Sequence, residues 1–316
     1  MTPESELEDT PPPSLLAKIF GISWSLVALL TILSYWQSPH FLNLVSSFRV
    51  QLLFALIVLS IPPLFLFPGK KKLLFLGVPA AISITLLSYF VPISFDRNEA
   101  ESQLSLAVAN VYSGNRDISR LETWLAKKPA DILVVLEVAS HHGEALENLG
   151  FKTVVSDPRE GNFGIALLSK QEPLRTEILE RDTPFPSILA EFDDYQIIAT
   201  HPIPPLDSEL RTVGDEQIER LAKLSESFEK PTIFVGDFNA TGWDMRVRPL
   251  EDLGLKDSRK GHGLLPTWPV GKPFMYIPID HIYVPEDWVA LDCQRGPDIG
   301  SDHFPLSATV QYPKKI

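Results

Sequence analysis

The pattern of apolar and polar positions divides the chain into two parts. Residues 19–95 consist of long apolar runs with few charges, whereas from residue 104 onward short apolar runs alternate with polar stretches. Long runs without an interleaved polar face are typical of membrane-spanning helices, and short runs bounded by turn residues are typical of strands. The pattern therefore predicts a membrane region followed by a folded domain of mixed secondary structure.

The first part contains three apolar runs of about the length that a membrane span needs. A helix requires roughly 20 apolar residues to cross the hydrocarbon core of a bilayer. We expect three transmembrane helices within residues 16–95, and Pro62 and Pro63 are expected to kink the second helix or to end it early. The three predicted helices occupy about residues 16–36, 50–67 and 73–92.

Flanking residues orient the predicted helices. Lys18 and the Lys70–Lys72 triplet flank one side of the three runs, whereas only Arg49 and Arg97 closely flank the other side. Because cytoplasmic loops carry the excess of Lys and Arg, the amino terminus and the triplet are predicted to be cytoplasmic. Three spans are an odd number, so the remaining chain is predicted to be extracytoplasmic, in a multi-pass protein of the plasma or inner membrane. The acidic, proline-rich tail, residues 1–15, is predicted to be disordered.

The second part, residues 100–316, alternates strand-like and helix-like segments. Several predicted strands follow one another with only a turn between them, which favours antiparallel hairpins. Two polar segments, residues 115–129 and 207–230, are predicted to be helices. Strands in pairs with helices between them favour a mixed α/β or α+β layered fold. The strands are predicted within residues 104–112, 130–138, 151–156, 163–169, 187–192, 195–201, 231–239, 279–284 and 303–312.

Composition and charge restrict the chemistry of this second part. The single cysteine, Cys293, excludes an internal disulfide framework and a cysteine-based zinc site. The chain has 28 Lys and Arg and 40 Asp and Glu, of which residues 1–92 hold 5 and 4, so residues 93–316 carry a net charge of −13. Such an acidic domain attracts a nucleic-acid backbone poorly, although bound metal ions could supply local positive charge. The chain has no G-x-S-x-G nucleophile motif and no H-E-x-x-H zinc motif.

Polar residues suited to metal and phosphate chemistry stand at the ends of the predicted strands. In TIFVGDFN, an apolar strand ends in Gly-Asp-x-Asn, which brings two polar side chains of the same parity to the rim of a sheet. A turn alone would explain one such segment. Many strand ends with Asn, Asp, Glu or His and almost no Lys favour instead a site for a hard divalent cation, with imidazoles for phosphoryl transfer. These residues are Asn110, Glu137, His201, Asp237, Asn239, Asp280, Asp302 and His303.

The order of these motifs resembles that of the endonuclease/exonuclease/phosphatase superfamily, which includes deoxyribonuclease I, exonuclease III-type enzymes, neutral sphingomyelinases and inositol polyphosphate phosphatases. The resemblance covers residues 104–312, and its most specific pieces are GDFN at 236–239 and SDHFPL at 301–306. The family triplet LQE appears here as VLE, which keeps Glu137 but loses the preceding amide. The resemblance implies an α+β fold, an α/β sandwich of two packed, mainly antiparallel sheets flanked by helices.

The resemblance also implies a metal-binding set. Glu137 would bind Mg²⁺, with Mn²⁺ or Ca²⁺ as alternatives, and Asn110 and Asp302 would complete or order its shell. Ions of this kind keep several waters and bind a substrate phosphate directly. Thr267 is a weaker candidate for a phosphate contact, and Trp268 is expected to pack beneath it.

Five further residues take catalytic roles by the same resemblance. Asp237 would orient or deprotonate the attacking water, and Asn239 would donate to the phosphate oxygens. His303 would activate the nucleophile or stabilise the pentacovalent state, while Asp280 fixes its tautomer. His201 would donate to a phosphate oxygen or protonate the leaving group. Because Asp280 and His303 stand at strand ends rather than in a core, we expect their substitution to cost little stability.

Three features favour a lipid substrate. The catalytic part, residues 100–316, is compact, it is acidic, and three predicted spans hold it beside a bilayer. The architecture resembles the teicoplanin-resistance-associated membrane proteins of bacteria, which implies a polyprenyl pyrophosphate or a related lipid. We therefore expect a membrane-bound, divalent-metal-dependent phosphatase or phosphodiesterase that acts on a phosphorylated lipid or lipid-linked headgroup. The alternative is a membrane-anchored extracytoplasmic nuclease acting on nucleic acid, and the sequence identifies no protein partner.

Overall fold

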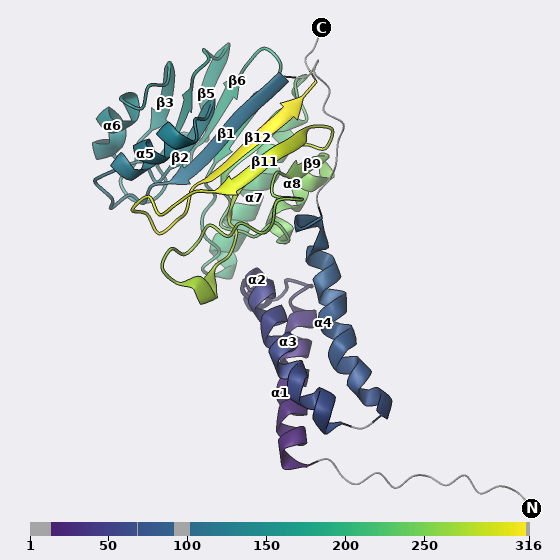
Figure 1. Ribbon diagram of the computed structural model, residues 1–316. Coiled ribbons are helices and arrows are strands. Elements are labelled where there is room, and N and C mark those ends of the chain that lie inside the picture. The colour runs from purple at the N-terminus through teal and green to yellow at the C-terminus, as the bar shows by residue number, and fades with distance from the viewer. Residues whose placement is uncertain (1–13, 68, 92–101, 314–316) are drawn as a thin grey trace, which may run out of the picture.

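A computed structural model describes residues 14–67, 69–91 and 102–313. It shows a group of helices attached to one end of a layered α/β domain (Figure 1). Most of the tail that was predicted to be disordered lies outside the described residues. Leu15 already belongs to the first helix, and Ser14 caps it, since Ser14 Oγ accepts a hydrogen bond from Ala17 N at 3.2 Å.

The helices before the domain are here called the helix group. They are α1 (Leu15–Leu33), α2 (His40–Ser47), α3 (Arg49–Leu66), η1 (Gly69–Lys71), α4 (Lys72–Leu86) and η2 (Leu87–Tyr89). Three of them, namely α1, α3 and α4 continued by η2, are long and apolar enough to cross a membrane. The short helix α2 was not predicted. Helix α3 continues through Pro62 and Pro63 and ends at Leu66, so these prolines do not end it early. They lie near its carboxyl end, where few backbone hydrogen bonds of the helix remain to be lost.

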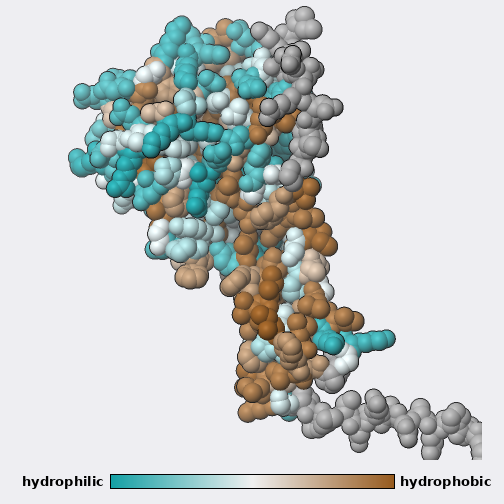
Figure 2. All heavy atoms as spheres, viewed as in Figure 1, coloured by the Kyte–Doolittle hydropathy of each residue, from teal (hydrophilic) through white to brown (hydrophobic). Residues whose placement is uncertain are grey.

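The helix group carries large apolar side chains on its outside. Figure 2 shows this apolar surface as a brown column below the domain. Inside the group, Trp24 Nε1 donates to Ser60 Oγ at 2.9 Å, and Ser60 Oγ donates to the carbonyl of Phe75 at 2.7 Å, which joins the three long helices. An apolar exterior of this extent is what a lipid-facing helix requires. Examples of exposed side chains are Ile22, Leu26, Phe54 and Ile84.

The domain contains two six-stranded sheets packed face to face. Its strands are β1 (Ser102–Asn110), β2 (Ile132–Leu136), β3 (Thr153–Asp157), β4 (Ile165–Ser169), β5 (Arg175–Leu179), β6 (Ser187–Glu191), β7 (Gln196–Thr200), β8 (Thr232–Asp237), β9 (Leu255–Asp257), β10 (Asp280–Pro285), β11 (Val289–Arg295) and β12 (Leu306–Tyr312). The strand orders are β11-β12-β1-β2-β4-β3 and β5-β6-β7-β8-β10-β9. In each sheet one neighbouring pair is parallel, β1 with β2 and β7 with β8, and the other pairs are antiparallel. This arrangement confirms the predicted fold.

Helices cover the outer faces of both sheets, and apolar residues fill the space between the sheets. Leu106 and Val134 of the first sheet meet Ile197 and Val235 of the second, and each is at most 1% exposed. Burying a side chain of this kind contributes about 1.5–3 kcal/mol, so the core holds the strands and their ends firmly. The connecting helices and turns are α5 (Ser119–Lys127), η3 (Ser140–His142), α6 (Gly143–Glu147), α7 (Ser208–Ser225), η4 (Met245–Val247), α8 (Arg248–Asp252) and η5 (Pro273–Met275).

Four central strands end at one edge of the domain. The strands β1 and β2 end side by side because they are parallel, and so do β7 and β8. Strand β10 begins at this edge, since Asp280 pairs with Asp237. We call it the shared edge, defined as the edge where β1, β2, β7 and β8 end and β10 begins. Connections from the carboxyl ends of these strands can therefore bring polar side chains of both sheets together.

The helix group contacts the domain on loops of this shared edge. The amide of Gln37 donates to the carbonyl of Trp243 at 2.8 Å, and its oxygen accepts from Met245 N at 2.8 Å. The amide of Asn43 donates to Asp244 Oδ2 at 2.7 Å. The remaining hydrogen bonds of the junction join Trp243 Nε1 to Ser46 O, Gln51 Nε2 to Tyr276 O, Gly261 N to Ser88 O and Gly263 N to Tyr89 O.

Candidate active site

Strand β8 brings Asp237 to the centre of the shared edge. Gly236 allows this, because a Cβ atom at this position would lie 1.9 Å from the carbonyl oxygen of Thr200 on β7. Asp237 is 1% exposed, and its Oδ1 accepts from Asn239 N at 2.8 Å. Asn239 has a φ of 49°, in the left-handed region, and its amide donates to the carbonyl of Pro202 at 3.0 Å. Asn239 thus closes the turn after β8 and keeps one N–H for a ligand.

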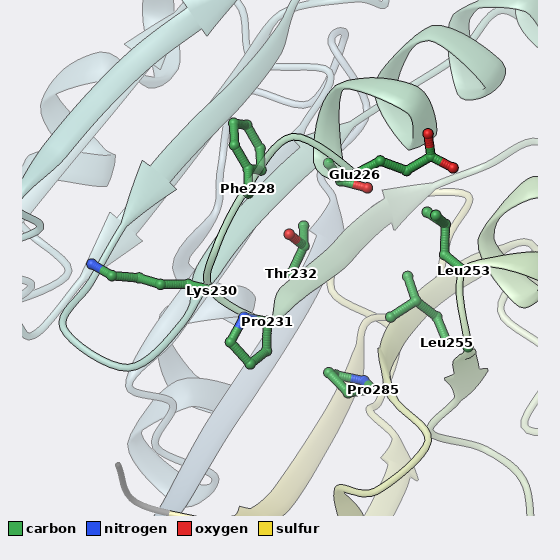
Figure 3. Close-up of a pocket in the computed structure, with 10 residues that line it drawn as sticks. Glu226, Phe228, Lys230, Pro231, Thr232, Leu253, Leu255 and Pro285 are labelled. Atoms are coloured by element: carbon green, nitrogen blue, oxygen red, sulfur yellow. The ribbon is translucent and has the colours of Figure 1, made fainter. Parts of the chain in front are cut away.

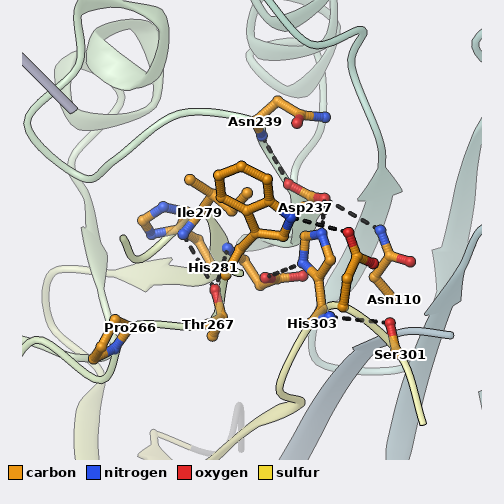
Figure 4. A network of polar contacts seen from close by, with 12 residues as sticks. Asn110, Asp237, Asn239, Pro266, Thr267, Ile279, His281, Ser301 and His303 are labelled. Atoms are coloured by element: carbon orange, nitrogen blue, oxygen red, sulfur yellow. Dashed lines mark hydrogen bonds and ion pairs between the residues drawn. The ribbon is translucent and has the colours of Figure 1, made fainter. Parts of the chain in front are cut away.

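His303 lies beside Asp237 (Figure 4) and forms a buried pair with Asp280. His303 Nδ1 lies 2.9 Å from Asp280 Oδ2, and His303 Nε2 lies 3.6 Å from Asp237 Oδ2. Asp280 and His303 are 1% and 4% exposed, so the expectation that they lie outside a core is wrong. Although burial lowers the pKa of His303, the two carboxylates outweigh it and raise the pKa to about 10. The ring is therefore an imidazolium at neutral pH.

His201 approaches Asp237 from the end of β7. Its Nε2 lies 3.5 Å from Asp237 Oδ2, and its Nδ1 is buried without a hydrogen-bond partner among the described residues. Burial lowers the pKa of His201, but the neighbouring Asp237 carboxylate reverses this and the net pKa is raised. In turn, burial would raise the pKa of Asp237, whereas the charges of His303 and His201 hold it at about 2. Asp237 is thus an ionised carboxylate between two imidazole rings.

Glu137 joins the cluster from the end of β2. Its φ of 60° is uncommon for a residue with a side chain, and such backbone strain is typical of functional sites. Glu137 Oε1 accepts from Asn110 Nδ2 at 2.9 Å, and Glu137 Oε2 accepts from Ser113 N at 3.2 Å. Asn110 Nδ2 also lies 3.3 Å from Asp237 Oδ2, and Asn110 Oδ1 accepts from Tyr112 N at 3.0 Å. Asn110 therefore holds the two carboxylates side by side, which favours an ordering role.

Asp302 and Thr267 lie outside the cluster of buried charged residues. Asp302 is exposed at the rim, where its Oδ2 accepts from Trp268 Nε1 at 3.0 Å. Thr267 is fully buried, and its hydroxyl accepts from the backbone N–H groups of Ile279 and Asp280, each at 3.2 Å. A phosphate contact for Thr267 is therefore not supported, because its hydroxyl holds the start of β10 in place.

The donor set fits a divalent cation. Glu137 is 7% exposed, and no Lys or Arg forms an ion pair with it, with Asp237 or with Asp280 in the described part of the chain. Glu137 has no ion-paired cationic side chain among the described residues, and a buried carboxylate of this kind is stable when a metal ion supplies the charge. Ligand atoms of Asp237, Asp280 and His303 also lie within 4.8 Å of one another. In that second group the imidazolium of His303 lies between the two carboxylates, whereas Glu137 has no such partner among the described residues.

A second polar network contacts β10 on the side that faces away from His303. His281 Nδ1 lies 2.8 Å from Asp257 Oδ2 and 2.9 Å from Arg259 Nη1, and Arg259 also donates to the backbone carbonyl of Asp280. His281 thus faces away from His303, as the alternation along a strand predicts (Figure 4). Burial raises the pKa of Asp257, but Arg259 and His281 outweigh it and lower the pKa.

Sequence reasoning missed three residues of the site. Ser301 Oγ accepts from His303 N at 3.1 Å, Ser113 N donates to Glu137, and the ring of Phe163 lies 5.4 Å from that of His201. Ser301 could have been found, because it is the first residue of the Ser-Asp-His motif. Ser113 acts through its backbone and Phe163 through packing, and neither leaves a signal in the sequence.

A hollow of about 260 Å³ at the opposite edge is not part of this site (Figure 3). It is lined by Thr232 at the start of β8, whereas Asp237 ends that strand, roughly 17 Å away at 3.3 Å per residue. Lys230, on its rim, is paired with Glu191 at 2.8 Å. Lys230 is therefore not free to bind a phosphate in this hollow.

The chain belongs to the Endonuclease/Exonuclease/phosphatase family, whose sequence model matches residues 107–303. The family and the enzyme class predicted from the motifs are thereby confirmed, and the protein is a phosphoester hydrolase. No curated protein matches the chain significantly.

Solved structures share the fold. The 3′ phosphatase NExo from Neisseria, bound to a product DNA hairpin, is 20% identical with a TM-score of 0.55, and the likeness covers 65% of this chain and 98% of that one. An AP endonuclease from Archaeoglobus fulgidus is 20% identical with a TM-score of 0.56, at 65% and 98% coverage. A humanized TDP2 from D. rerio is 17% identical with a TM-score of 0.54, at 66% and 98% coverage. At these identities the likeness shows the fold alone.

Proposed function

We propose that the protein is a membrane-anchored, divalent-metal-dependent phosphatase or phosphodiesterase whose substrate is a phosphorylated lipid or a lipid-linked headgroup. We further propose that its amino terminus is cytoplasmic and its catalytic domain extracytoplasmic. The observation that carries the substrate class is the position of the site. The cluster around Asp237 lies at the shared edge, and the loops of that same edge bind the helix group. A substrate held in the bilayer would thus meet the site directly.

Glu137 would hold the metal, with Asn110 ordering it and Asp302 reaching it from the rim. A bound Mg²⁺ would neutralise charge on the phosphate as the transition state forms. Mg²⁺ is the proposed ion, and Mn²⁺ and Ca²⁺ are the alternatives. The remaining steps belong to side chains of the protein itself.

Asp237 accepts a hydrogen bond from the attacking water and takes its proton as the water oxygen bonds to phosphorus. The bond from phosphorus to the leaving oxygen breaks, and His201 acts as the acid that supplies the proton this oxygen needs. His303 donates one N–H to Asp280, and its other N–H, which lies 3.6 Å from Asp237 Oδ2 and makes no hydrogen bond to it, stabilises negative charge on the phosphate oxygens. The free N–H of Asn239 makes a similar contact. Charge stabilisation and orientation of this kind account for most of the rate in phosphoryl transfer.

The alternative is an extracytoplasmic nuclease. The solved structures with this fold include one bound to a DNA hairpin and an AP endonuclease. Against it stand the net charge of −13 over residues 93–316 and the absence, among the described residues, of any Lys or Arg ion-paired with the buried carboxylate cluster. The two functions differ in substrate and share the same site.

A substrate panel tests the proposal. The full chain in detergent is incubated with Mg²⁺, Mn²⁺ or Ca²⁺ and with phospholipids, polyprenyl pyrophosphate or plasmid DNA, and Glu137→Gln serves as the matched inactive control. Metal-dependent release of phosphate or headgroup from a lipid, lost in the control, supports the proposal. Turnover of DNA with no lipid turnover replaces it with the nuclease.

A further inference from the structure

Large apolar side chains that face solvent are concentrated on one edge of the catalytic domain. Six such side chains occur in the described residues 102–313, and five of them lie on loops of the shared edge. The sixth, Leu174, lies at the opposite edge and is 62% exposed. The five are Tyr112, Leu206, Met245, Phe274 and Met275.

The most exposed of them is at the tip of the loop between Trp268 and Asp280. Phe274 is 90% exposed and Met275 is 42% exposed, and both belong to the short helix η5. Lys272 precedes them, is exposed, and forms no ion pair in the described part of the chain. In Figure 1 the yellow-green loop with η5 projects downward from the domain, toward the level of the helix group. A basic residue followed by an aromatic and a methionine is typical of segments that bind the boundary of a bilayer.

Contacts of aromatic and charged side chains hold the base of this loop in place. The exposed tip is therefore part of an ordered loop. Arg295 lies over the ring of Phe304 at 4.3 Å and over that of Tyr276 at 5.6 Å. The two rings meet edge to face at 5.7 Å. A tip that is rigid and apolar loses little entropy when it enters a lipid surface.

One hydrogen bond fixes the height of the tip relative to the helix group. Gln51 Nε2 donates to the carbonyl of Tyr276 at 2.8 Å, and Gln51 lies in the first turn of α3. Phe274 is only two residues from that carbonyl. The tip therefore lies at the level where α3, a candidate span, begins. The helix α2 continues the apolar surface at this level, with Phe41 55% and Leu44 39% exposed.

We propose that Phe274 and Met275 enter the headgroup–acyl boundary of the bilayer that holds the helix group, with Lys272 at the lipid phosphates. This inference rests on the proposed membrane function and deepens it, because the same loop ends in Asp280 and holds the rim residue Asp302 through Trp268. Insertion of the tip would press the mouth of the site against the lipid surface. The lipid is favoured over a protein partner because the tip is continuous with the apolar surface of the helix group.

Depth-dependent quenching tests the insertion without any need for turnover. Burial raises the pKa of the only thiol, Cys293, to about 12 and shields it, so a thiol probe will label introduced cysteines selectively. The full chains with Phe274→Cys or Leu174→Cys are labelled with an environment-sensitive fluorophore and placed in phosphatidylcholine–phosphatidylglycerol vesicles. We expect nitroxide groups on the upper acyl chain to quench the probe at 274 and to spare the probe at 174. Equal quenching at the two positions would overturn the insertion.

An activity comparison then separates insertion from chemistry. Phe274→Asp should lower hydrolysis of lipid in vesicles by about tenfold and leave hydrolysis of a water-soluble phosphodiester unchanged, because the tip touches no reacting group. The control Leu174→Asp should change neither rate. Equal losses on both substrates would overturn the inference. A quenched probe at 274 in a protein that hydrolyses DNA and no lipid would instead leave the insertion standing and reject the proposed substrate.

Discussion

Removal of His303 should damage stability as well as catalysis, and the damage should be partly repaired by a second substitution at Asp280. The imidazolium of His303 lies between the buried carboxylates of Asp280 and Asp237. His303→Ala leaves Asp280 as a buried charge without its partner, and Asp280 Oδ1 already has no hydrogen-bond partner among the described residues. Breaking a buried pair in this way costs about 3–5 kcal/mol. For a domain of this size that corresponds to a fall in melting temperature of about 10 °C.

Asp280→Asn alone should lower the free energy of unfolding by less than His303→Ala does, by about 1–3 kcal/mol. The amide bonds His303 less well than the carboxylate does, but it leaves no uncompensated charge at position 280. In the double variant the uncompensated charge at position 280 is absent, so the double variant should be more stable than His303→Ala alone. Catalysis should behave differently: His303→Ala should lower turnover by about 10²–10⁴-fold, and the double variant should be scarcely worse, since the two residues act as a unit.

The assay is thermal unfolding of the full chain in detergent with EDTA, followed by tryptophan fluorescence, beside turnover with saturating Mg²⁺. Trp268, whose ring lies 6.5 Å from that of His303, is one of the six tryptophans that give this signal. Stability losses that simply add, or rate losses that simply multiply, would refute the reasoning, because they would mean that the two residues work independently.

Three further predictions concern the metal, the charge of His303 and the topology. Glu137→Gln should lower activity by orders of magnitude and recover part of it at high metal, and activity that survives EDTA would rule out the metal site. Burial lowers the pKa of His303 but the carboxylates raise it from 6.5 to about 10, so its contribution to stability is complete below pH 6.5 and is lost as the pH rises through about 10. In EDTA, the melting temperature of the wild type should therefore fall more between pH 7 and pH 10 than that of His303→Gln, and parallel curves would contradict this. Alkaline phosphatase fused to the carboxyl terminus should be active outside the cytoplasm, whereas a fluorescent cytoplasmic fusion would reverse the proposed orientation.

The strands that carry the site were predictable because their burial leaves a strong pattern. Runs such as 132–136 and 233–235 are apolar throughout, and each is followed within two residues by a carboxylate, Glu137 or Asp237. The strands β5, β9 and β11 were not predicted. β5, β9 and β11 lie at sheet edges, and β5 and β11 are largely exposed or half-buried, so their sequences alternate weakly.

Side-chain contacts in the site were less predictable than the backbone positions. Asn239 follows β8 with the expected spacing, yet its amide reaches the carbonyl of Pro202, which is distant in sequence. Asp302 and Thr267 depend in the same way on Trp268 and on the backbone of β10. Sequence spacing determines which residues reach the shared edge, whereas the direction of each side chain depends on partners that only the folded chain supplies.

If the site at the shared edge serves a lipid phosphate, that lipid should be hydrolysed in preference to DNA when both are present. The full chain in vesicles receives Mg²⁺, a phosphorylated lipid in the same bilayer and plasmid DNA in the surrounding solution at equal phosphate concentration, with both products followed in one reaction. We predict that lipid phosphate is consumed, that DNA stays intact, and that Glu137→Gln abolishes the lipid reaction. Cleavage of the DNA with the lipid untouched would contradict the account.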